Sequence, residues 1–151
     1  MAATPHITER AYKWAHSLYR RNSKPLGVTW HHADCVKCGP DDVHRWHLAN
    51  GWSGIAYHFF VAKNGTIYQG RPEWALGGHA LGCSAKIGIC CEGDYEHVDH
   101  EMPAKQLAAG RWLHGYLEKK YGAIPDRRHK DEPGNSTGCP GRWFPFAKLT
   151  K

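Results

Sequence analysis

RHKDEPGNSTGCPG, residues 128–141, is the segment around which this chain is organised. It carries an imidazole at His129 and a thiol at Cys139, joined by Pro, Gly, Asn and Ser residues that favour an irregular loop over a helix or a strand. A loop of this composition can fold back until both side chains point at one spot. Imidazole nitrogen and thiolate sulfur are ligand types that zinc prefers, so the segment predicts two ligands of a metal site.

A third ligand is expected from Trp30-His31-His32-Ala33, in a short run upstream that is typical of a strand. Neighbouring side chains of a strand face opposite sides, so only one of the two histidines can join the site. Three protein ligands leave the fourth tetrahedral position of zinc open to water, and this open position distinguishes a catalytic zinc from a structural one.

The length and composition indicate one globular domain with a basic surface. The 151 residues are enough to bury a core without disulfide bonds. Seven Trp and seven Tyr residues suit a groove that packs against sugar rings or peptide, in addition to a core. The net charge of +6 suits a polyanionic target such as nucleic acid, anionic lipid or bacterial cell wall, and composition alone does not choose among them.

Six cysteines, at positions 35, 38, 83, 90, 91 and 139, raise the possibility of a secreted disulfide framework. The first residues lack the basic stretch followed by an apolar stretch that marks a secretory signal peptide. No apolar run approaches the roughly 20 residues of a membrane span. We therefore expect mostly reduced thiols, synthesis in a cytoplasm and a functional role for Cys139. A protein of this kind that acts beyond the membrane needs another agent to release it.

The N-terminal residues predict an additional helix. Thr4 is a favourable N-cap and Pro5 a favourable first helical residue. An apolar stripe at helical spacing then continues to about Arg21, formed by Ile7, Ala11, Trp14 and Leu18. We expect residues 1–25 to pack on the domain as this helix. An alternative is that its aromatic side chains contact a partner, namely Tyr12, Trp14 and Tyr19.

The remainder of the chain alternates strand and helix patterns. Strands are predicted at 26–32, 56–62, 66–70 and 86–92, and helices at about 40–50 and 103–121. Asn64-Gly65 between two β-rich runs is a strong hairpin signal, and Gly122 suits the C-terminal cap of the longer helix. This order predicts an α/β fold in which residues 26–151 form a single domain, with a central mixed β-sheet flanked by helices, plus the extra N-terminal helix.

Cys35-Val36-Lys37-Cys38 is a second cysteine pattern in the chain. It fits a half-site for structural zinc or a redox pair, but no second Cys-x-x-Cys is present to complete a four-sulfur site. A loop with two thiols, or with a local disulfide, is the simpler interpretation. The sequence leaves these alternatives open.

Three anchors follow one another along the chain: Val28-Thr29-Trp30-His31-His32-Ala33, Gly54-Ile55-Ala56-Tyr57-His58-Phe59, and the segment from His129 to Cys139-Pro140-Gly141. Together they resemble the zinc-dependent N-acetylmuramoyl-L-alanine amidases of the bacteriophage-lysozyme and peptidoglycan-recognition-protein family. Shorter matches add to the resemblance: Lys63-Asn64-Gly65-Thr66 with Gly70-Arg71, Gly78-His79-Ala80, and Ile87-Gly88-Ile89. The resemblance covers about residues 26–148, nearly the whole chain.

By this resemblance the ligands of one Zn2+ ion fall on His31, His129 and Cys139. The first histidine of the adjacent pair is the family's ligand, which leaves His32 as a core, rim or substrate-binding residue. His79 is placed by analogy at the edge of the groove, where it would bind the sugar or the stem peptide. A purely structural role is the alternative for His79.

The resemblance also implies two catalytic side chains, Tyr57 and Thr137. Tyr57 matches the family's catalytic tyrosine, and its phenol, with an ordinary pKa of about 10, suits orienting water or donating to an oxyanion better than acting as a base. Some phage members carry a catalytic lysine two residues before the cysteine, where this chain has Thr137, as other catalytic members do. Zinc itself would lower the pKa of bound water to about 7 and polarise the carbonyl.

The activity implied is that of a peptidoglycan hydrolase that cleaves the amide bond between N-acetylmuramic acid and L-alanine of the stem peptide. Such an enzyme would be a phage or prophage endolysin or a bacterial autolysin. Its partner would be bacterial peptidoglycan, and a monomer is favoured. It would be made in the bacterial host cytoplasm without a signal peptide and would act on the cell wall after release.

Other function classes fit the sequence less well. The main alternative is a non-catalytic peptidoglycan-binding module of the same fold, although such relatives commonly lack the cysteine that is present here as Cys139. Nucleic acid is not expected as the main partner, because the His/Cys spacing fits no zinc finger and the basic residues are scattered. A zinc nucleobase deaminase would need H-x-E and P-C-x-x-C motifs that are absent. No motif marks the carboxylate pair of a glycosidase.

Overall fold

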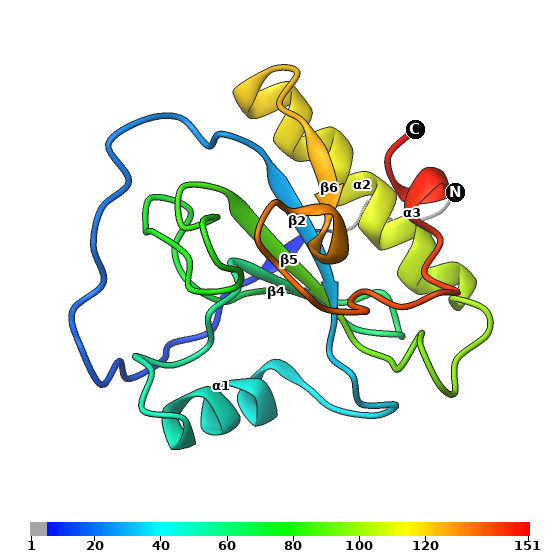
Figure 1. Cartoon of the computed structure of the whole chain (residues 1–151), viewed down its shortest axis with the longest axis horizontal. Helices are drawn as coiled ribbons and strands as arrows, with labels where there is room; N and C mark the ends of the chain where they lie inside the picture. Colours follow the sequence, from blue (N-terminus) through cyan, green and yellow to red (C-terminus); the bar gives the residue numbers. More distant parts are fainter. Residues whose placement is uncertain (1–5) are drawn as a thin grey trace.

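The computed structural model describes residues 6–151 and contains a six-stranded mixed β-sheet with helices on its faces (Figure 1). The strands lie in the order β1-β4-β3-β5-β2-β6. In chain order the elements are β1 (Ile7–Thr8), β2 (Val28–His32), α1 (Pro40–Ala49), β3 (Phe59–Val61), β4 (Ile67–Gln69), β5 (Ile87–Cys91), α2 (Ala104–Tyr121), β6 (Asp126–Arg128), the 3-10 turn η1 (His129–Asp131) and α3 (Phe146–Leu149). The predicted α/β class, with a mixed sheet in a single domain, is confirmed.

Strand β2 pairs in parallel with β5 on one side and with the edge strand β6 on the other. β3 pairs in parallel with β5 and antiparallel with β4. The antiparallel pair is the predicted hairpin, and Gly65 in its turn has φ +92, a left-handed conformation that glycine adopts without steric cost. Because β2, β5 and β6 run in the same direction, their C-terminal ends meet at one edge of the sheet.

Two cores form on the opposite faces of the sheet. Alternate residues of β2 and β5, such as Val28, Trp30 and Ile89, pack with α2 in the larger core. Val43 of α1, Phe60 and Cys90 belong to the smaller core on the other face. Side chains alternate along a strand, so the residue after Trp30 points away from α2 and towards the side of α1. This alternation decides which histidine of the adjacent pair can enter a site on that side.

The predicted N-terminal helix is wrong for the residues that the structure describes, and Thr4 and Pro5 lie outside that range. Residues 6–24 hold the short strand β1 and otherwise follow an extended path around the molecule into β2, drawn in blue in Figure 1. The Ala15 N–H donates to the Ser53 carbonyl at 2.9 Å, and the Arg21 N–H donates to the Trp74 carbonyl at 2.8 Å. These backbone groups bond to distant segments instead of closing helical turns, so tertiary pairing overrides the helical spacing of the apolar residues.

The apolar side chains of this segment are nevertheless buried in part against the domain. Ile7 pairs with Ile67 of β4 and packs on the larger core. Tyr12 and Trp14 pack against His44 of α1, with ring centroids 4.4 and 5.5 Å from that imidazole. The segment therefore adds an edge strand and an aromatic cover to the same sheet.

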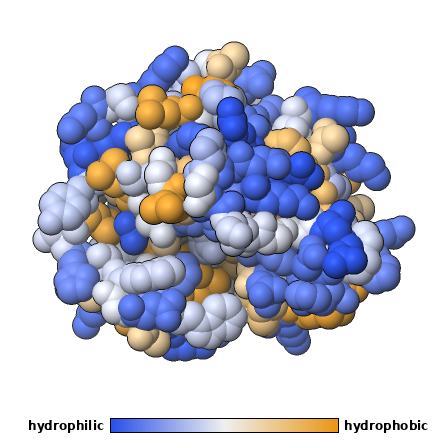
Figure 2. Space-filling model, viewed as in Figure 1, coloured by the Kyte–Doolittle hydropathy of each residue, from blue (hydrophilic) through white to orange (hydrophobic). Residues whose placement is uncertain are grey.

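The face in Figure 2 is largely hydrophilic, with hydrophobic residues scattered among charged ones. None of the helices in the described part of the chain has both the length and the apolar character to cross a membrane.

Gln106 of α2 ties the helix to the sheet through buried polar contacts. Its Nε2 donates to the carbonyl oxygens of Val61 and Glu92, each at 2.9 Å. Its Oε1 accepts a hydrogen bond from the Tyr95 hydroxyl. The side chain is fully buried, so no water can replace these partners.

We predict that Gln106→Leu lowers the free energy of unfolding by about 2–6 kcal/mol, because the buried Glu92 carbonyl and Tyr95 hydroxyl lose their partners at roughly 1–3 kcal/mol each. Urea unfolding of the metal-free protein measures the change. Arg111→Gln, on the exposed side of the same helix, serves as the control and should stay within about 0.5 kcal/mol of the parent. Equal stability of Gln106→Leu and the parent would contradict this role.

Candidate metal centre and its cleft

The parallel pairing of β6 with β2 brings two histidines side by side. Trp30 lies opposite Arg128 in this register, so the next residues on the two chains, His31 and His129, emerge at the same edge of the sheet. Their ring centroids are 4.6 Å apart. Since Trp30 faces α2, His31 projects from the opposite face of the sheet.

Cys139 returns to this point because the loop after β6 closes on itself. The Lys130 N–H donates to the Cys139 carbonyl oxygen at 2.8 Å, and the His32 N–H donates to Cys139 Sγ at 3.4 Å. The sulfur lies 3.8 Å from Nδ1 of His31. A tetrahedral zinc ion with ordinary Zn–N and Zn–S bonds would set this separation at about 3.6 Å. One ligand atom of His129 completes a group whose members lie within 4.8 Å of one another.

The tautomer of His31 is set by a chain of hydrogen bonds behind it. His79 Nε2 lies 3.0 Å from the Lys86 carbonyl, which can only accept, so this nitrogen carries the proton. His79 Nδ1 is then an acceptor, and it lies 2.9 Å from Nε2 of His31. His31 therefore donates through Nε2 and keeps the lone pair of Nδ1 on the side of Cys139. Burial, with contributions from His79 and His129, holds the pKa of His31 well below its ordinary value, so the ring stays neutral.

Gly88 of β5 makes room for this arrangement. A Cβ atom at this position would lie 2.5 Å from the ring carbons of His79. Any side chain at position 88 would push that imidazole out of the layer behind His31. The Ile87-Gly88-Ile89 stretch noted in the sequence thus has a packing reason at its centre.

His129 is oriented in the same way by Asn135 of its own loop. The Asn135 Nδ2 group donates to the Leu81 carbonyl at 2.9 Å, which fixes Oδ1 as the acceptor end of the amide. Nε2 of His129 lies 2.9 Å from that Oδ1 and therefore carries the proton. Nδ1 of His129 is the one buried side-chain nitrogen or oxygen in residues 6–151 without a hydrogen-bond partner. A buried lone pair of this kind is the feature expected of a metal ligand.

The donor set fits a metal ion with one open coordination position. Two neutral imidazoles and a sulfur suit zinc, and three protein ligands are the usual number for a catalytic zinc site. Burial raises the pKa of the Cys139 thiol to about 12, although the hydrogen bond from the His32 N–H acts in the opposite direction. The metal-free site therefore holds a thiol at neutral pH, and an ion must displace its proton.

A second cluster, His32 with Asp34 and Asp94, also has ligand-type atoms within 4.8 Å of one another. Its hydrogen bonds do not suit a metal. The Tyr95 N–H donates to Nδ1 of His32 at 3.0 Å, so that lone pair is used and Nε2 carries the proton of the neutral ring. His32 thus offers an N–H donor, whereas His31 and His129 offer bare lone pairs.

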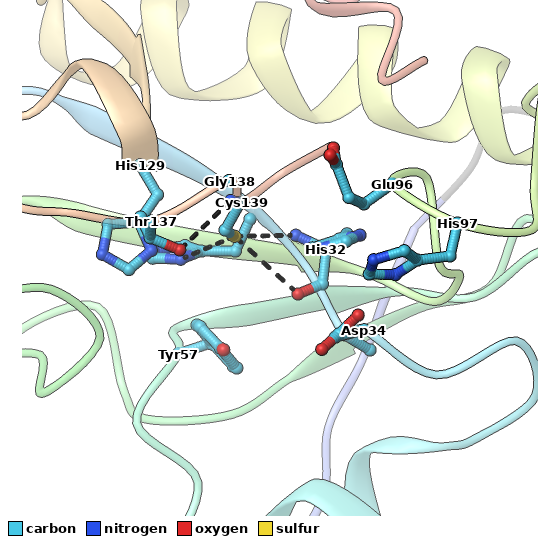
Figure 3. A pocket seen from close by; sticks show the side chains of 11 residues that line it. His32, Asp34, Tyr57, Glu96, His97, His129, Thr137, Gly138 and Cys139 are labelled. Carbon is cyan, nitrogen blue, oxygen red and sulfur yellow. Dashed lines mark hydrogen bonds between the residues drawn. The ribbon is translucent and has the colours of Figure 1, made fainter. Parts of the chain in front are cut away.

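A cleft of about 320 Å³ opens beside the three ligands. Figure 3 shows His129, Thr137 and Cys139 together at one end, and Glu96, His97 and Asp34 at the other. The cleft is lined by His31, His32, Ala33, Asp34, Tyr57, Glu96, His97, His129, Thr137, Gly138 and Cys139. It combines a metal-type site with hydrogen-bonding groups on its walls.

Tyr57 and Thr137 supply two hydroxyl groups to this cleft. The ring of Tyr57 packs 4.9 Å from that of His31 between centroids. Burial, together with the nearby thiols of Cys90 and Cys139, raises the pKa of Tyr57 well above its ordinary value, so the phenol keeps its proton. Thr137 Oγ1 accepts a hydrogen bond from the Cys139 N–H at 3.2 Å, which leaves its own proton free to donate into the cleft.

The structure brings most of the residues named from the sequence to one cleft and moves one of them away. The lining includes His31, His32, Tyr57, Thr137 and the two loop ligands. His79, expected at the groove edge, is instead buried behind His31 with both ring nitrogens engaged inside the protein. A substrate contact does not fit this geometry because no nitrogen of the ring is left for one.

Sequence reasoning missed Asn135, whose role depends on contacts with Leu81, far along the chain. The only local signal was its place in the loop between the two expected ligands. It also missed the acidic end of the cleft at Asp34 and Glu96, since the two residues come from separate loops.

Comparisons with known proteins agree with this geometry. A family model described as N-acetylmuramoyl-L-alanine amidase matches residues 21–142. The endolysin of Escherichia phage T7 is 33% identical over 115 residues, which cover 70% of this chain and 74% of that protein. Among solved structures, N-acetylmuramoyl-L-alanine amidase LysC from Clostridium intestinale URNW superposes with a TM-score of 0.88 at 40% identity, over 97% of this chain and 95% of LysC. Drosophila PGRP-LB superposes with a TM-score of 0.77 at 28% identity, over 93% of this chain and 91% of that chain.

We predict that Asn135→Leu weakens the binding of Zn2+ by roughly 10- to 100-fold, the usual cost of losing the partner that orients a metal-binding histidine. Asn135→Asp keeps an acceptor for the Nε2 proton of His129 and should stay close to the parent. Competition with a chromophoric chelator measures both affinities. If Asn135→Leu binds the ion as tightly as Asn135→Asp, the amide does not orient His129.

Proposed function

Because this chain belongs to the N-acetylmuramoyl-L-alanine amidase family, we propose that His31, His129 and Cys139 hold the zinc ion used in its reaction and that Tyr57 and Thr137 assist beside it. The activity follows from the family: the chain is an amidase that hydrolyses the bond between N-acetylmuramic acid and L-alanine in peptidoglycan and thereby lyses cell walls. The observation that carries the proposal for the site is the buried, unpartnered Nδ1 of His129, a residue with a ligand atom within 4.8 Å of those of His31 and Cys139.

Zinc is the ion that this donor set favours, and the family is typically zinc-dependent. When bound, zinc acts as a Lewis acid towards a carbonyl oxygen and towards water. The chain's own contribution is to hold His31 neutral with Nδ1 unprotonated, to give Nε2–H of His129 an acceptor at Asn135, and to present a sulfur that the His32 N–H stabilises. Each of these features is present before any ion binds.

Amide hydrolysis also needs hydrogen-bond donors near the developing oxyanion. Tyr57 and Thr137 fit this role because both are protonated hydroxyl groups on the wall of the cleft beside Cys139. With its raised pKa, Tyr57 cannot act as a general base at neutral pH, so we assign it the orientation of water and donation to the oxyanion. Thr137 donates without carrying a charge, and its Oγ1 is held in place by the Cys139 N–H.

Substrate contact is proposed for His32 and not for His79. The Nε2–H group of His32 has no partner in the described chain and belongs to the cleft wall, where it can donate to a carbonyl or hydroxyl oxygen of the substrate. His79 is proposed to act through His31, by accepting its Nε2 proton. The two histidines thus differ in role because one has a free donor at the cleft and the other has none.

Peptidoglycan is the partner, and the phage endolysin relatives act on the cell wall. We propose that the protein is made in the cytoplasm of a bacterial host, reaches the wall after release and acts as a monomer. The net charge of +6 would favour approach to an anionic wall. Non-catalytic binding of wall fragments is the alternative that the next experiment separates.

Mass spectrometry of purified cell walls after digestion tests the function directly. We expect new free L-alanine amino termini and intact glycan strands, and no release after a chelator has removed the metal. New reducing ends would indicate glycosidase chemistry instead. Stoichiometric zinc without any released amine would favour the non-catalytic binding module.

We predict that Tyr57→Phe lowers turnover by about a hundredfold or more, since loss of one oxyanion donor typically costs on the order of 3 kcal/mol of transition-state stabilisation. The zinc content of the variant should equal that of the parent, because the phenol is not among the ligands. Release of amino groups from cell walls and metal analysis measure the two quantities. A turnover near that of the parent would remove Tyr57 from the mechanism.

We predict that zinc binding in mildly alkaline buffer releases about one proton more from the parent than from Cys139→Ser, because the thiol of Cys139 gives up its proton when it binds the ion. The sign follows from the pKa shifts. The thiol, with its pKa raised to about 12, is protonated in the metal-free site, whereas His31, with its pKa lowered, is neutral and has no proton on Nδ1 to lose. Affinity should therefore rise with pH and fall on acidification.

Titration calorimetry in buffers of different ionisation enthalpy counts the protons released. Cys139→Ser serves as the matched variant, in which the sulfur proton is absent. Release of no proton by the parent would show that Cys139 does not bind as a thiolate.

A further inference from the structure

A buried ion pair lies beneath the metal-binding loop. The side chain of Glu132 has no exposed surface, and its Oε2 lies 2.7 Å from Nζ of Lys86. The same carboxylate accepts hydrogen bonds from the Thr29 hydroxyl at 3.2 Å and from the Cys83 thiol. Burial alone would raise the pKa of Glu132, but the hydrogen bonds from Cys83 and Lys86 hold it below its ordinary value, so the group stays charged.

Glu132 occupies the turn that carries the second histidine ligand. Its backbone N–H donates to the His129 carbonyl at 3.1 Å, and its carbonyl accepts from the Asn135 N–H at 3.2 Å. Glu132 is therefore bonded through its backbone to the ligand His129 and to the residue that sets the tautomer of that ligand. Its side chain fixes this turn to β2 through Thr29 and to the residue before β5 through Lys86.

Lys86 is linked to the first histidine ligand by a different atom. Its carbonyl oxygen accepts the Nε2 proton of His79, and His79 in turn accepts the proton of His31. One residue thus supports both ligands: its backbone determines the tautomer of His31, and its ammonium group holds the turn of His129. None of these contacts involves the cleft, whose lining contains neither Lys86 nor Glu132.

We propose that Lys86 and Glu132 are positioning residues that brace the two histidine ligands against each other, so that metal affinity depends on an ion pair that touches neither the ion nor the substrate. The inference rests on the metal site proposed above. The brace holds the turn of His129 in the position where its ring lies 4.6 Å from that of His31 between centroids. Without the brace, the described contacts leave no ion pair between the loop that follows β6 and Lys86, the residue before β5.

A matched ion pair elsewhere in the fold separates bracing from general stabilisation. Glu73 also holds a lysine and two hydroxyl groups, with Lys120 Nζ at 3.1 Å and the Tyr116 and Tyr121 hydroxyls at 2.8 and 2.6 Å. It binds α2 and lies outside the cleft and its loop. A change at Glu73 therefore tests the loss of a partly buried carboxylate network without affecting either histidine.

The experiment compares Zn2+ affinity and metal-free stability in five variants: Glu132→Gln, Lys86→Met, the double variant of these two, Lys86→Arg and Glu73→Gln. Chelator competition gives the affinity, and urea unfolding without metal gives the stability. We expect Glu132→Gln and Lys86→Met to bind Zn2+ roughly 10- to 100-fold more weakly. The double variant should be no weaker than the poorer single variant. Lys86→Arg should recover most of the affinity, and Glu73→Gln should bind Zn2+ like the parent.

The double variant decides the outcome because it leaves no uncompensated buried charge, and replacing a buried ion pair by neutral groups is often harmless to stability. A double variant that folds like the parent but binds Zn2+ weakly supports the brace. One that binds Zn2+ with parental affinity, or one that fails to fold, overturns it, since the pair would then be dispensable or would serve the fold as a whole. If the parent and His129→Ala bind Zn2+ equally, the metal site itself is wrong.

Discussion

Placement of two protons is the constraint on which the rest of the site depends. An imidazole can bind a metal only through a nitrogen that carries no proton. Each histidine here donates a hydrogen bond from Nε2–H to an acceptor inside the protein. For His31 the acceptor is His79, itself fixed by the Lys86 carbonyl, and for His129 it is Asn135. This leaves Nδ1 of each ring as the candidate ligand atom, and one ligand atom each of His31, His129 and Cys139 lies within 4.8 Å of the other two.

The sheet makes this arrangement possible by its register. Parallel pairing of β6 with β2 carries His31 and His129 to the same edge, and pairing of β5 with β2 places Gly88 where the ring of His79 needs space. The loop that follows then closes on Cys139 through backbone hydrogen bonds. Strand pairing holds His31, and backbone hydrogen bonds of the turn and loop hold His129 and Cys139.

The sequence predicted what local patterns can encode. Hydrophobic spacing and turn residues located the hairpin at Gly65, the two main helices and most strands, and the resemblance named the histidines and cysteine that the structure brings together. It failed where the deciding contact is distant. The N-terminal apolar spacing suggested a helix, but Ala15 and Arg21 bond to residues far along the chain. His79 was placed at the groove by analogy, since nothing local reveals that it lies behind His31, and no local pattern pointed to Glu132, whose partner Lys86 is 46 residues away.

A crystal structure of the zinc-loaded protein, with an anomalous difference map measured at the zinc edge, tests the proton placement most directly. We expect one peak within bonding distance of Nδ1 of His31, Nδ1 of His129 and Sγ of Cys139, with no fourth protein ligand. Coordination through Nε2 of either histidine, a fourth protein atom on the ion, or a peak at His32 and Asp34 instead would contradict it.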